Sequence, residues 1–575
     1  MGGGRPGPVA GLAEAYMART IKALLDLVEL EFEPAEAAEK GAPPGPHHQE
    51  LRRIRRFCGP LNYIACYLGA LARLFSPASS SGDVVGFRLR RLEDWTGESA
   101  NGPRSMDPYR EVLQYLSHPC GASCVFCVHD GDPPGHFTRG RRWQVPHAEL
   151  MTRLKFYRPG EGRALPCTSD LHSFEITTHP LWHETLAHLR RKTGDTFIVV
   201  TNGFTLDEAE IRTLGPFGPF LFVVSVNESV AARRAQVMGH RARRAPASIV
   251  NLHRARLPFI ASITPALGTS AEEIVETVRY VDQFSPYLIR LNLPGRTRFH
   301  RGGQGDMRRH WRTILAAARR ARGKTRSAVV IQPLLYLENH LLPRPMAAVL
   351  AGTVPGSPAE RAGLLCGDEV TAIEGRPVSY REVARGFLAS LARAGRGVTV
   401  RIVRGGSPRE VSILPDGGDC PYRAVGAPFD SSYPFGMVLT DGLAPRHWKA
   451  VLATVAGRGA EKTLLLTGEL MLPTVGQFMR EFGCGGTAMY CEAVPNTSFL
   501  GGDILPADLL VVDDFIAAAR GFMNRTGVQP DLILVPGTAF SVWGFDISGR
   551  PFADIGRNLG IPVATITGRR ALAIG

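Results

Sequence analysis

Three cysteines that lie close together in the sequence are the residues best suited to do chemistry. Cys120, Cys124 and Cys127 have the spacing C-x3-C-x2-C within the run HPCGASCVFCVH. Three thiolates this close can ligate three irons of a cubane iron–sulfur cluster and leave the fourth iron open. An open iron is useful because the amino and carboxylate groups of a bound molecule can chelate it. Zinc is the alternative, with His118 or His129 as the fourth ligand that a zinc site normally requires.

The chain around these cysteines alternates between short apolar strands and helices. Helices are expected between several of the strands, for example over 183–192 and 271–284. The expected strands are 112–116, 173–177, 197–201, 221–226, 259–264 and 287–293. Such alternation favours a parallel sheet, and six units predict a partial barrel, shorter than the full eight-unit one. The cysteines follow the first expected strand, at the carboxyl end where barrels place their active sites.

The cysteine motif resembles the signature of a large enzyme family. C-x3-C-x-aromatic-C, with Phe126 as the aromatic residue, is similar to the signature of the radical S-adenosylmethionine (SAM) superfamily, and the resemblance covers about residues 110–300. It implies a partial (β/α)6 barrel that holds a [4Fe–4S] cluster and binds SAM at the open iron. It also implies an electron donor such as flavodoxin or ferredoxin, because one electron splits SAM into methionine and a 5′-deoxyadenosyl radical. The protein then positions a substrate beside that radical.

Four further residues match positions at which the superfamily binds SAM. After the second strand the superfamily commonly has Gly-Gly-Glu-Pro, which contacts the SAM amino group, and this chain has Thr-Thr-His-Pro beginning at Thr177. Backbone carbonyls can still accept a hydrogen bond from the amine, so Thr177 and Thr178 are candidates. Ser225 and Asn227 end the fourth expected strand, where the superfamily often meets the SAM ribose or carboxylate. The Thr-Asn-Gly run at 201–203 matches a turn that is common after the third strand.

A middle segment resembles a PDZ domain. Residues 352–378 read GTVPGSPAERAGLLCGDEVTAIEGRPV, which is similar to the Gly-Ser-Pro-Ala, Gly-Asp and turn pattern of that family. The resemblance implies binding of an extended peptide beside an edge strand. Residues 345–350 take the place of the loop that holds a peptide carboxylate, but they lack its glycines. We therefore predict weak or no binding of C-terminal peptides, and packing of this PDZ-like module on the barrel is the alternative to ligand binding.

The C-terminal segment resembles an uncharacterised domain that accompanies radical SAM and PDZ modules in one bacterial family. The shared features are Leu-Thr-Gly at 466–468, the run VPNTSFLGGD at 494–503 and an apolar strand at 531–536. Strands are expected at 463–466, 509–512, 532–535 and 562–566. Asn496, Gly501, Gly502 and Asp503 form a polar, glycine-rich turn that either faces a ligand or simply reverses the chain.

Size and composition fit a protein of several globular domains. The chain has 575 residues, 44% of them hydrophobic, and a net charge of +14. Its arginines are spread along the chain, which favours solvated faces over nucleic-acid binding. We find neither an apolar run of membrane-spanning length nor a signal peptide, and the scattered cysteines fit a reducing compartment, so we expect a cytoplasmic protein that binds no membrane. The expected domains are a helical N-terminal region (1–105), a partial barrel (106–335), a PDZ-like module (340–415) and a C-terminal α/β domain (430–575).

These observations together predict an α/β protein with a partial (β/α)6 TIM-like barrel, a PDZ-like β-rich module and a C-terminal α/β domain. The leading hypothesis is a radical SAM enzyme with a small-molecule or peptide substrate. One alternative is a radical SAM enzyme that modifies a peptide or protein recruited by the PDZ-like module. Another is a metal-stabilised scaffold without catalysis, which would release no 5′-deoxyadenosine.

Overall fold

The computed structural model describes most of the chain from residue 168 onward and the cysteine loop. The described residues are 120–127, 147, 168–171, 175–194, 196–300, 302, 305–332, 346–415, 433–439, 445–505, 507–540, 546, 548 and 550–566. All of them belong to one compact unit, made of residues 97–105 and 109–575. The expected N-terminal helical region and the expected strand at 112–116 lie outside the described residues. No described helix is long and apolar enough to cross a membrane.

A six-stranded parallel sheet follows the cysteine loop, and its strands lie in sequence order from β1 to β6. The strands are β1 (Thr168–Leu171), β2 (Thr196–Thr201), β3 (Phe220–Ser225), β4 (Phe259–Ile263), β5 (Leu288–Asn292) and β6 (Ala328–Gln332). Strands β2 to β6 are rich in buried Val, Ile, Leu and Phe, as expected for a parallel sheet covered on both faces. Closure of this sheet into a partial barrel stays a prediction.

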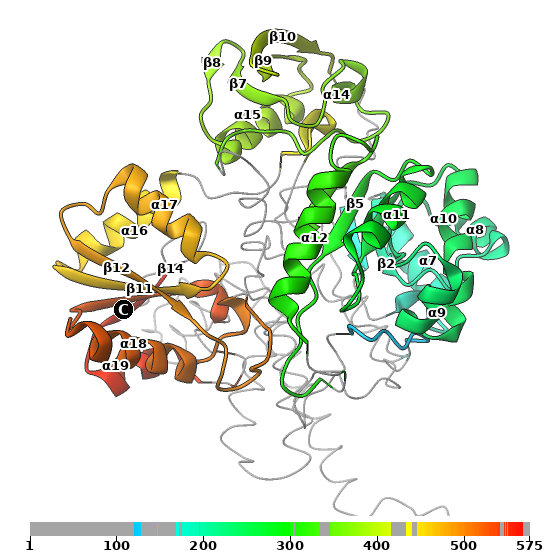
Figure 1. The fold of residues 1–575 in the computed structure, drawn as a ribbon. Coiled ribbons are helices and arrows are strands. Elements are labelled where there is room, and N and C mark those ends of the chain that lie inside the picture. The colour runs from blue at the N-terminus through cyan, green and yellow to red at the C-terminus, as the bar shows by residue number, and fades with distance from the viewer. Residues whose placement is uncertain are drawn as a thin grey trace, which may run out of the picture. The chain divides into compact units, whose positions relative to one another are not determined.

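Helices connect the strands of this sheet (Figure 1). They are α7 (Trp182–Lys192), α8 (Glu208–Leu214), α9 (Ala231–Met238), α10 (Ala245–Arg254), α11 (Ala271–Asp282) and α12 (Met307–Ala321), with short 3-10 turns at Ile176–Thr178, Gly215–Phe217 and His240–Arg244. Local sequence sets several of the helix starts. Asp207 caps α8 and Asp306 caps α12 through a side-chain oxygen, and Ser270 with Glu273 forms a capping box on α11.

The PDZ-like module is a small antiparallel sheet with two helices. It contains β7 (Glu369–Ile373), β8 (Arg376–Pro377), β9 (Val398–Arg404) and β10 (Ser407–Ile413), in the order β10-β9-β7-β8, with α14 (Pro358–Arg361) and α15 (Arg381–Arg393). Asp368, from the Gly-Asp pair of the sequence motif, is buried and forms a two-point ion pair with Arg404, both distances being 2.6 Å. This ion pair ties the end of β9 to the start of β7.

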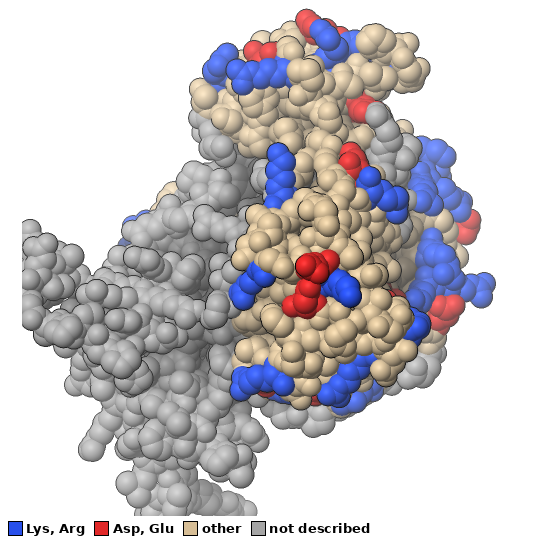
Figure 2. All heavy atoms as spheres, turned by 90° about the vertical axis from the view of Figure 1, so that its left-hand side faces the viewer, with Lys and Arg blue, Asp and Glu red and all other residues tan. Residues whose placement is uncertain are grey.

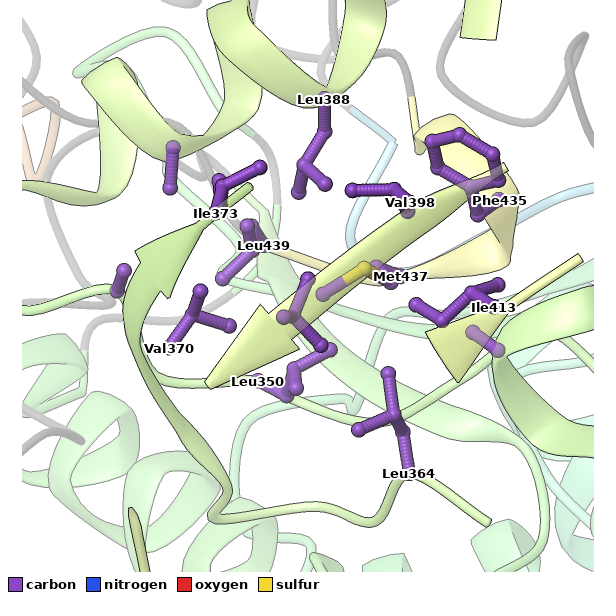
Figure 3. Packing of buried hydrophobic residues seen from close by; sticks show 14 of the residues in the cluster. Leu350, Leu364, Val370, Ile373, Leu388, Val398, Ile413, Phe435, Met437 and Leu439 are labelled. Atoms are coloured by element: carbon purple, nitrogen blue, oxygen red, sulfur yellow. The ribbon is translucent and has the colours of Figure 1, made fainter. Parts of the chain in front are cut away.

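A later segment, residues 433–439, completes this module. Its backbone pairs with residues 351–354, through Ala351 N to Val438 O (2.9 Å) and Val354 N to Gly436 O (2.9 Å). Figure 3 shows that Phe435, Met437 and Leu439 enter the same apolar core as Leu388 on α15 and Val398 on β9. The module therefore extends beyond residue 415. The chain's own segment 433–439 thus pairs with the stretch that follows residues 345–350.

The PDZ-like module also packs on the six-stranded sheet. Ala351, Val354, Tyr433 and Val438 share one buried cluster with alternate residues of strands β2 to β6. The sheet residues of that cluster are Ile198, Leu221, Val223, Ile260, Leu288, Ala328 and Val330. One face of the sheet is thus covered by the module.

The C-terminal region is a four-stranded parallel sheet between two layers of helices (Figure 1). Its elements are α16 (Pro445–Gly457), β11 (Lys462–Gly468), α17 (Leu472–Phe482), β12 (Ala488–Val494), α18 (Val512–Thr526), β13 (Leu532–Pro536), α19 (Ala553–Leu559) and β14 (Val563–Ile566), with short 3-10 turns at Ala507–Leu509 and Gly537–Ala539. The strand order is β12-β11-β13-β14. Helices α16 and α17 share one core with the sheet, and α18 and α19 share another.

Most of the expected strands are confirmed within one or two residues, but two are wrong. Residues 176–178 form a 3-10 turn instead of the end of a strand, because Thr178 Oγ1 donates to the carbonyl of Glu175 at 2.8 Å. Residues 509–512 end another 3-10 turn and begin α18, whose third residue, Asp514, accepts from the backbone N–H of Val511 at 3.1 Å. Both runs are short, and at this length pattern alone does not distinguish a strand from a turn.

Candidate functional site

The cysteine loop, residues 120–127, is fixed against the end of α9. Ser123 N donates to Met238 O at 2.8 Å and Val125 N donates to Val237 O at 2.9 Å. Gly239, with φ +90°, follows α9 where an added Cβ would lie 3.3 Å from the Ser123 side chain. Met238 Sδ also accepts from Asn227 Nδ2, just after β3, at 3.2 Å, so these contacts hold the loop near the carboxyl end of the sheet.

The three thiols share one loop, and Cys127 lies close enough to Cys120 to act on it electrostatically. Cys120 Sγ accepts a hydrogen bond from Asn202 Nδ2 at 3.6 Å. Burial raises the pKa of Cys120, the negative charges of Glu175 and Cys127 raise it further, and the Asn202 contact opposes them. Among the described residues, no three His, Cys, Asp or Glu side chains are close enough to hold a metal ion.

A buried carboxylate, which the sequence interpretation missed, organises the turn beside Cys120. Glu175 is completely buried, and its Oε1 accepts from Thr177 Oγ1 at 2.6 Å and from Thr201 Oγ1 at 2.7 Å. Its Oε2 accepts from Asn202 N at 2.7 Å. Burial raises the pKa of Glu175, and these hydrogen bonds oppose that rise. The only sequence signal was one acidic residue in a stretch of apolar and hydroxyl side chains.

The predicted residues Thr177 and Thr178 use their hydroxyls within the protein. Thr177 Oγ1 donates to Glu175 and accepts from Thr205 Oγ1 at 2.6 Å, and Thr178 Oγ1 donates to a backbone carbonyl. The neighbouring His179 accepts from Leu181 N at 3.0 Å, immediately before α7. The hydroxyls of the two threonines therefore hold the turn together.

Polar side chains connect the carboxyl ends of three neighbouring strands. Ser225 ends β3 and is half-buried; Asn227 follows it with φ +56°. Asn227 Oδ1 accepts from Thr264 N at 2.8 Å. Asn292 Nδ2 in turn donates to Ser262 Oγ at 2.8 Å and to Thr264 Oγ1 at 2.9 Å. Thr264 and Asn292 were not predicted from the sequence, because their role depends on strand neighbours.

A cavity of about 420 Å³ joins the cysteine loop to these strand ends. Besides cysteines and apolar groups, it is lined by Thr264 after β4 and by Asp503 from the C-terminal region. Its lining comprises Cys124, Phe126, Cys127, Thr264, Leu293, Pro294, Gly295, Trp311, Asp503, Ile504 and Leu509. Of the residues predicted from the sequence, Cys124, Cys127 and Phe126 meet here, whereas Cys120, Thr177, Thr178, Ser225 and Asn227 are not part of the lining.

Two further cysteines lie in the C-terminal region, on β12 and after α17. Cys491, on β12, is mostly buried, and burial raises its pKa to about 12, so its thiol stays protonated and inert. Cys484 is half-buried in the turn after α17. On the face in Figure 2, described Lys and Arg side chains lie in separate small groups, several of them beside Asp or Glu.

Comparisons with known proteins identify one module of the chain. Residues 350–404 match the family model of the PDZ domain. A search of curated proteins returned no match.

Solved structures give distant similarities. For Streptococcus suis SuiB bound to S-adenosylmethionine, the identity is 12%, the TM-score 0.32, and the coverage 52% of this chain and 63% of SuiB. For SuiB bound to the precursor peptide SuiA, the identity is 11%, the TM-score is 0.31, and the match covers 57% of this chain and 64% of SuiB. For TYW1 with a lysine-pyruvate adduct, the identity is 15%, the TM-score is 0.22, and the match covers 31% of this chain and 63% of TYW1. The matches span less than two thirds of each of these proteins. Because the identities and TM-scores are low, we derive the function from the residues of the site alone.

Proposed function

We propose that this protein is a radical SAM enzyme whose [4Fe–4S] cluster is held by Cys120, Cys124 and Cys127. The observation that carries the proposal is the cavity of about 420 Å³, which Cys124, Cys127 and the motif aromatic Phe126 line together with residues following β4 and β5. Three thiols on one loop suit an iron–sulfur cluster with one open iron. When bound and reduced, such a cluster supplies the electron that splits SAM into methionine and a 5′-deoxyadenosyl radical.

The residues around the loop have separate tasks in this proposal. Asn202 donates to Cys120 Sγ and thereby orients one cluster ligand. Backbone carbonyls of Thr177 and Thr178 accept from the SAM amino group, while Ser225 and Asn227 help to seat the rest of SAM at the end of β3. The apolar lining excludes water from the radical.

The proposal also covers the shape of the sheet, the electron donor and the substrate. The six parallel strands curve into a partial (β/α)6 barrel, and a flavodoxin or ferredoxin reduces the cluster in the cytoplasm. The substrate is a small molecule or a peptide. The PDZ-like module acts as a packing element, because residues 433–439 pair with its strand and it covers one face of the sheet.

Anaerobic reconstitution tests the proposal. Wild type should bind about four irons and four sulfides at the cysteine loop and, with dithionite and SAM, release 5′-deoxyadenosine measurable by mass spectrometry. The triple variant Cys120→Ala/Cys124→Ala/Cys127→Ala should lose both properties. Cys366→Ala, in the PDZ-like module, is the matched control and should keep both.

Two results would redirect the proposal. Zinc in the anaerobically purified wild type, without SAM cleavage, would favour the scaffold. Tight binding of a peptide with a free C-terminal carboxylate to the PDZ-like module would favour an enzyme that recruits and modifies peptides or proteins, since we expect such binding to be weak.

A further inference from the structure

The VPNTSFLGGD run ends against the loop between β5 and α12. Arg298 N donates to Leu500 O at 2.8 Å, and Asp503 N donates to Arg296 O at 2.7 Å. Gly502, with φ +72°, lies so close to the carbonyl of Arg296 that a side chain would collide with it. These backbone contacts place the turn, residues 500–503, directly on the chain that follows β5.

Hydrogen bonds inside the run hold the turn in shape. Asn496 Oδ1 accepts from Gly501 N at 3.0 Å, and its Nδ2 donates to Leu509 O at 3.0 Å. The buried carboxylate of Asp514 accepts from the backbone of Thr497 (2.9 Å) and Ser498 (2.8 Å). The polar residues of the run thus act on the turn itself, which fixes where Asp503 lies.

Asp503 lines the cavity together with Cys124 and Cys127. Among the described residues, none donates a hydrogen bond to its carboxylate or forms an ion pair with it. The charges of Arg296 and Arg308 act on it from a distance, and Arg308 is itself paired with Glu469 at 2.5 Å. Partial burial raises the pKa of Asp503. A half-buried carboxylate without a hydrogen-bond donor is costly, and a bound ligand can supply the missing donor.

The other residues that line the cavity indicate which kind of group the rest of that ligand carries. Five of its side chains are large and apolar: Phe126, Leu293, Trp311, Ile504 and Leu509. Trp311 is fixed because its Nε1 donates to Pro294 O at 2.7 Å, which leaves the indole without a free donor. Such a surface accepts an apolar or aromatic body.

We propose that the cavity binds a substrate with an apolar body and a cationic amine, and that Asp503 pairs with the amine. This inference rests on the proposed function, and it names the substrate class of the same site. A charge-assisted hydrogen bond in a partly dry cavity strengthens binding by roughly tenfold or more. Asp503 is thereby a specificity residue supplied by the C-terminal region.

Two probes of nearly equal shape test the inference in the reconstituted full-length protein. By calorimetry, 2-phenylethylamine should bind wild type about tenfold more tightly than 2-phenylethanol. Asp503→Asn should abolish this preference. Asp306→Asn is the control: Asp306 acts electrostatically on Asp503 but does not line the cavity, and an asparagine can keep its cap on Arg309 N. The control should keep the preference.

The possible outcomes separate this inference from the proposed function. Equal binding of amine and alcohol to wild type would overturn it without reference to any variant. A preference for the amine that survives in Asp503→Asn would also overturn the inference. So would an Asp503→Asn variant that loses affinity for SAM alone, because Asp503 would then contact SAM. Absence of 5′-deoxyadenosine would instead count against the proposed function, since the amine preference is measured without turnover.

Discussion

Asn202 connects Cys120 to Glu175: its side-chain amide donates to Cys120 Sγ at 3.6 Å and its backbone N–H donates to Glu175 Oε2 at 2.7 Å. The end of β2 thereby contacts both a proposed cluster ligand and a buried carboxylate. Cluster potential depends on hydrogen bonds to the sulfurs. The Asn202 side chain is therefore placed to adjust the potential.

Asn202→Ser should lower the reduction potential of the cluster, because the thiolate loses a donor that stabilises the reduced, more negative state. A serine oxygen can still accept from Phe204 N, as Asn202 Oδ1 does at 2.9 Å, so the turn should persist. A redox titration followed by electron paramagnetic resonance measures the potential. Asn251→Ser is the control, since Asn251 donates to Leu206 O at a distance from the loop. An unchanged or higher potential in Asn202→Ser would contradict this role.

Glu175→Ala should destabilise the fold by about 3 kcal/mol or more, because three buried donors lose their acceptor at about 1–3 kcal/mol each. Glu175→Gln retains one acceptor oxygen and should lose less. Urea unfolding of the two variants measures the difference in free energy. If alanine and glutamine cost the same, small amount, the carboxylate does not organise the turn.

The cysteine motif and most of the strands could be recognised in the sequence because both signals are local. Close spacing of Cys120, Cys124 and Cys127 can be seen directly, and buried runs such as β3 and β13 stand out against polar turns. Glu175 could not be predicted in the same way. Its partners at Thr201 and Asn202 come from the next strand, so its role exists only once β2 lies beside the preceding turn.

The part of the cavity that the C-terminal region supplies could not be predicted from the sequence either, because it depends on contacts between residues far apart in the chain. The glycine-rich turn before Asp503 was noticed in the sequence, but either a ligand or a chain reversal could explain it. Only its contacts with Arg296 and Arg298 show where it lies. Segment 433–439 likewise gave no signal of belonging to the PDZ-like module, because its partners at 351–354 are about eighty residues earlier in the chain.

Gly436→Ala should test whether segment 433–439 belongs to the PDZ-like module. Gly436 has φ +79°, and an added Cβ would collide with the Ser357 side chain. We expect a loss of about 2–4 kcal/mol, from about 1 kcal/mol of left-handed backbone strain and about 1–3 kcal/mol of overpacking. Gly406→Ala is the matched control, with φ +82° and nothing within 4 Å, and should cost only the strain. Equal losses in chemical unfolding would mean that the segment is not packed against Ser357.

Gly502→Ala should displace the turn that carries Asp503. Gly502 and Gly501 have similar positive φ values, +72° and +59°, so an alanine at either position meets similar backbone strain. The new Cβ at 502 would collide with the carbonyl of Arg296, whereas at 501 it would lie 3.5 Å from the Arg298 side chain, an ordinary contact. The difference between the two variants therefore reports only on the contact between the turn and Arg296.

Gly502→Ala should lose most of the roughly tenfold preference for 2-phenylethylamine over 2-phenylethanol. Its cluster should also bleach faster in air, because the cavity opens beside the cluster. Gly501→Ala should keep wild-type behaviour in both measurements. Identical bleaching rates and probe preferences in the two variants would show that the turn does not close the cavity.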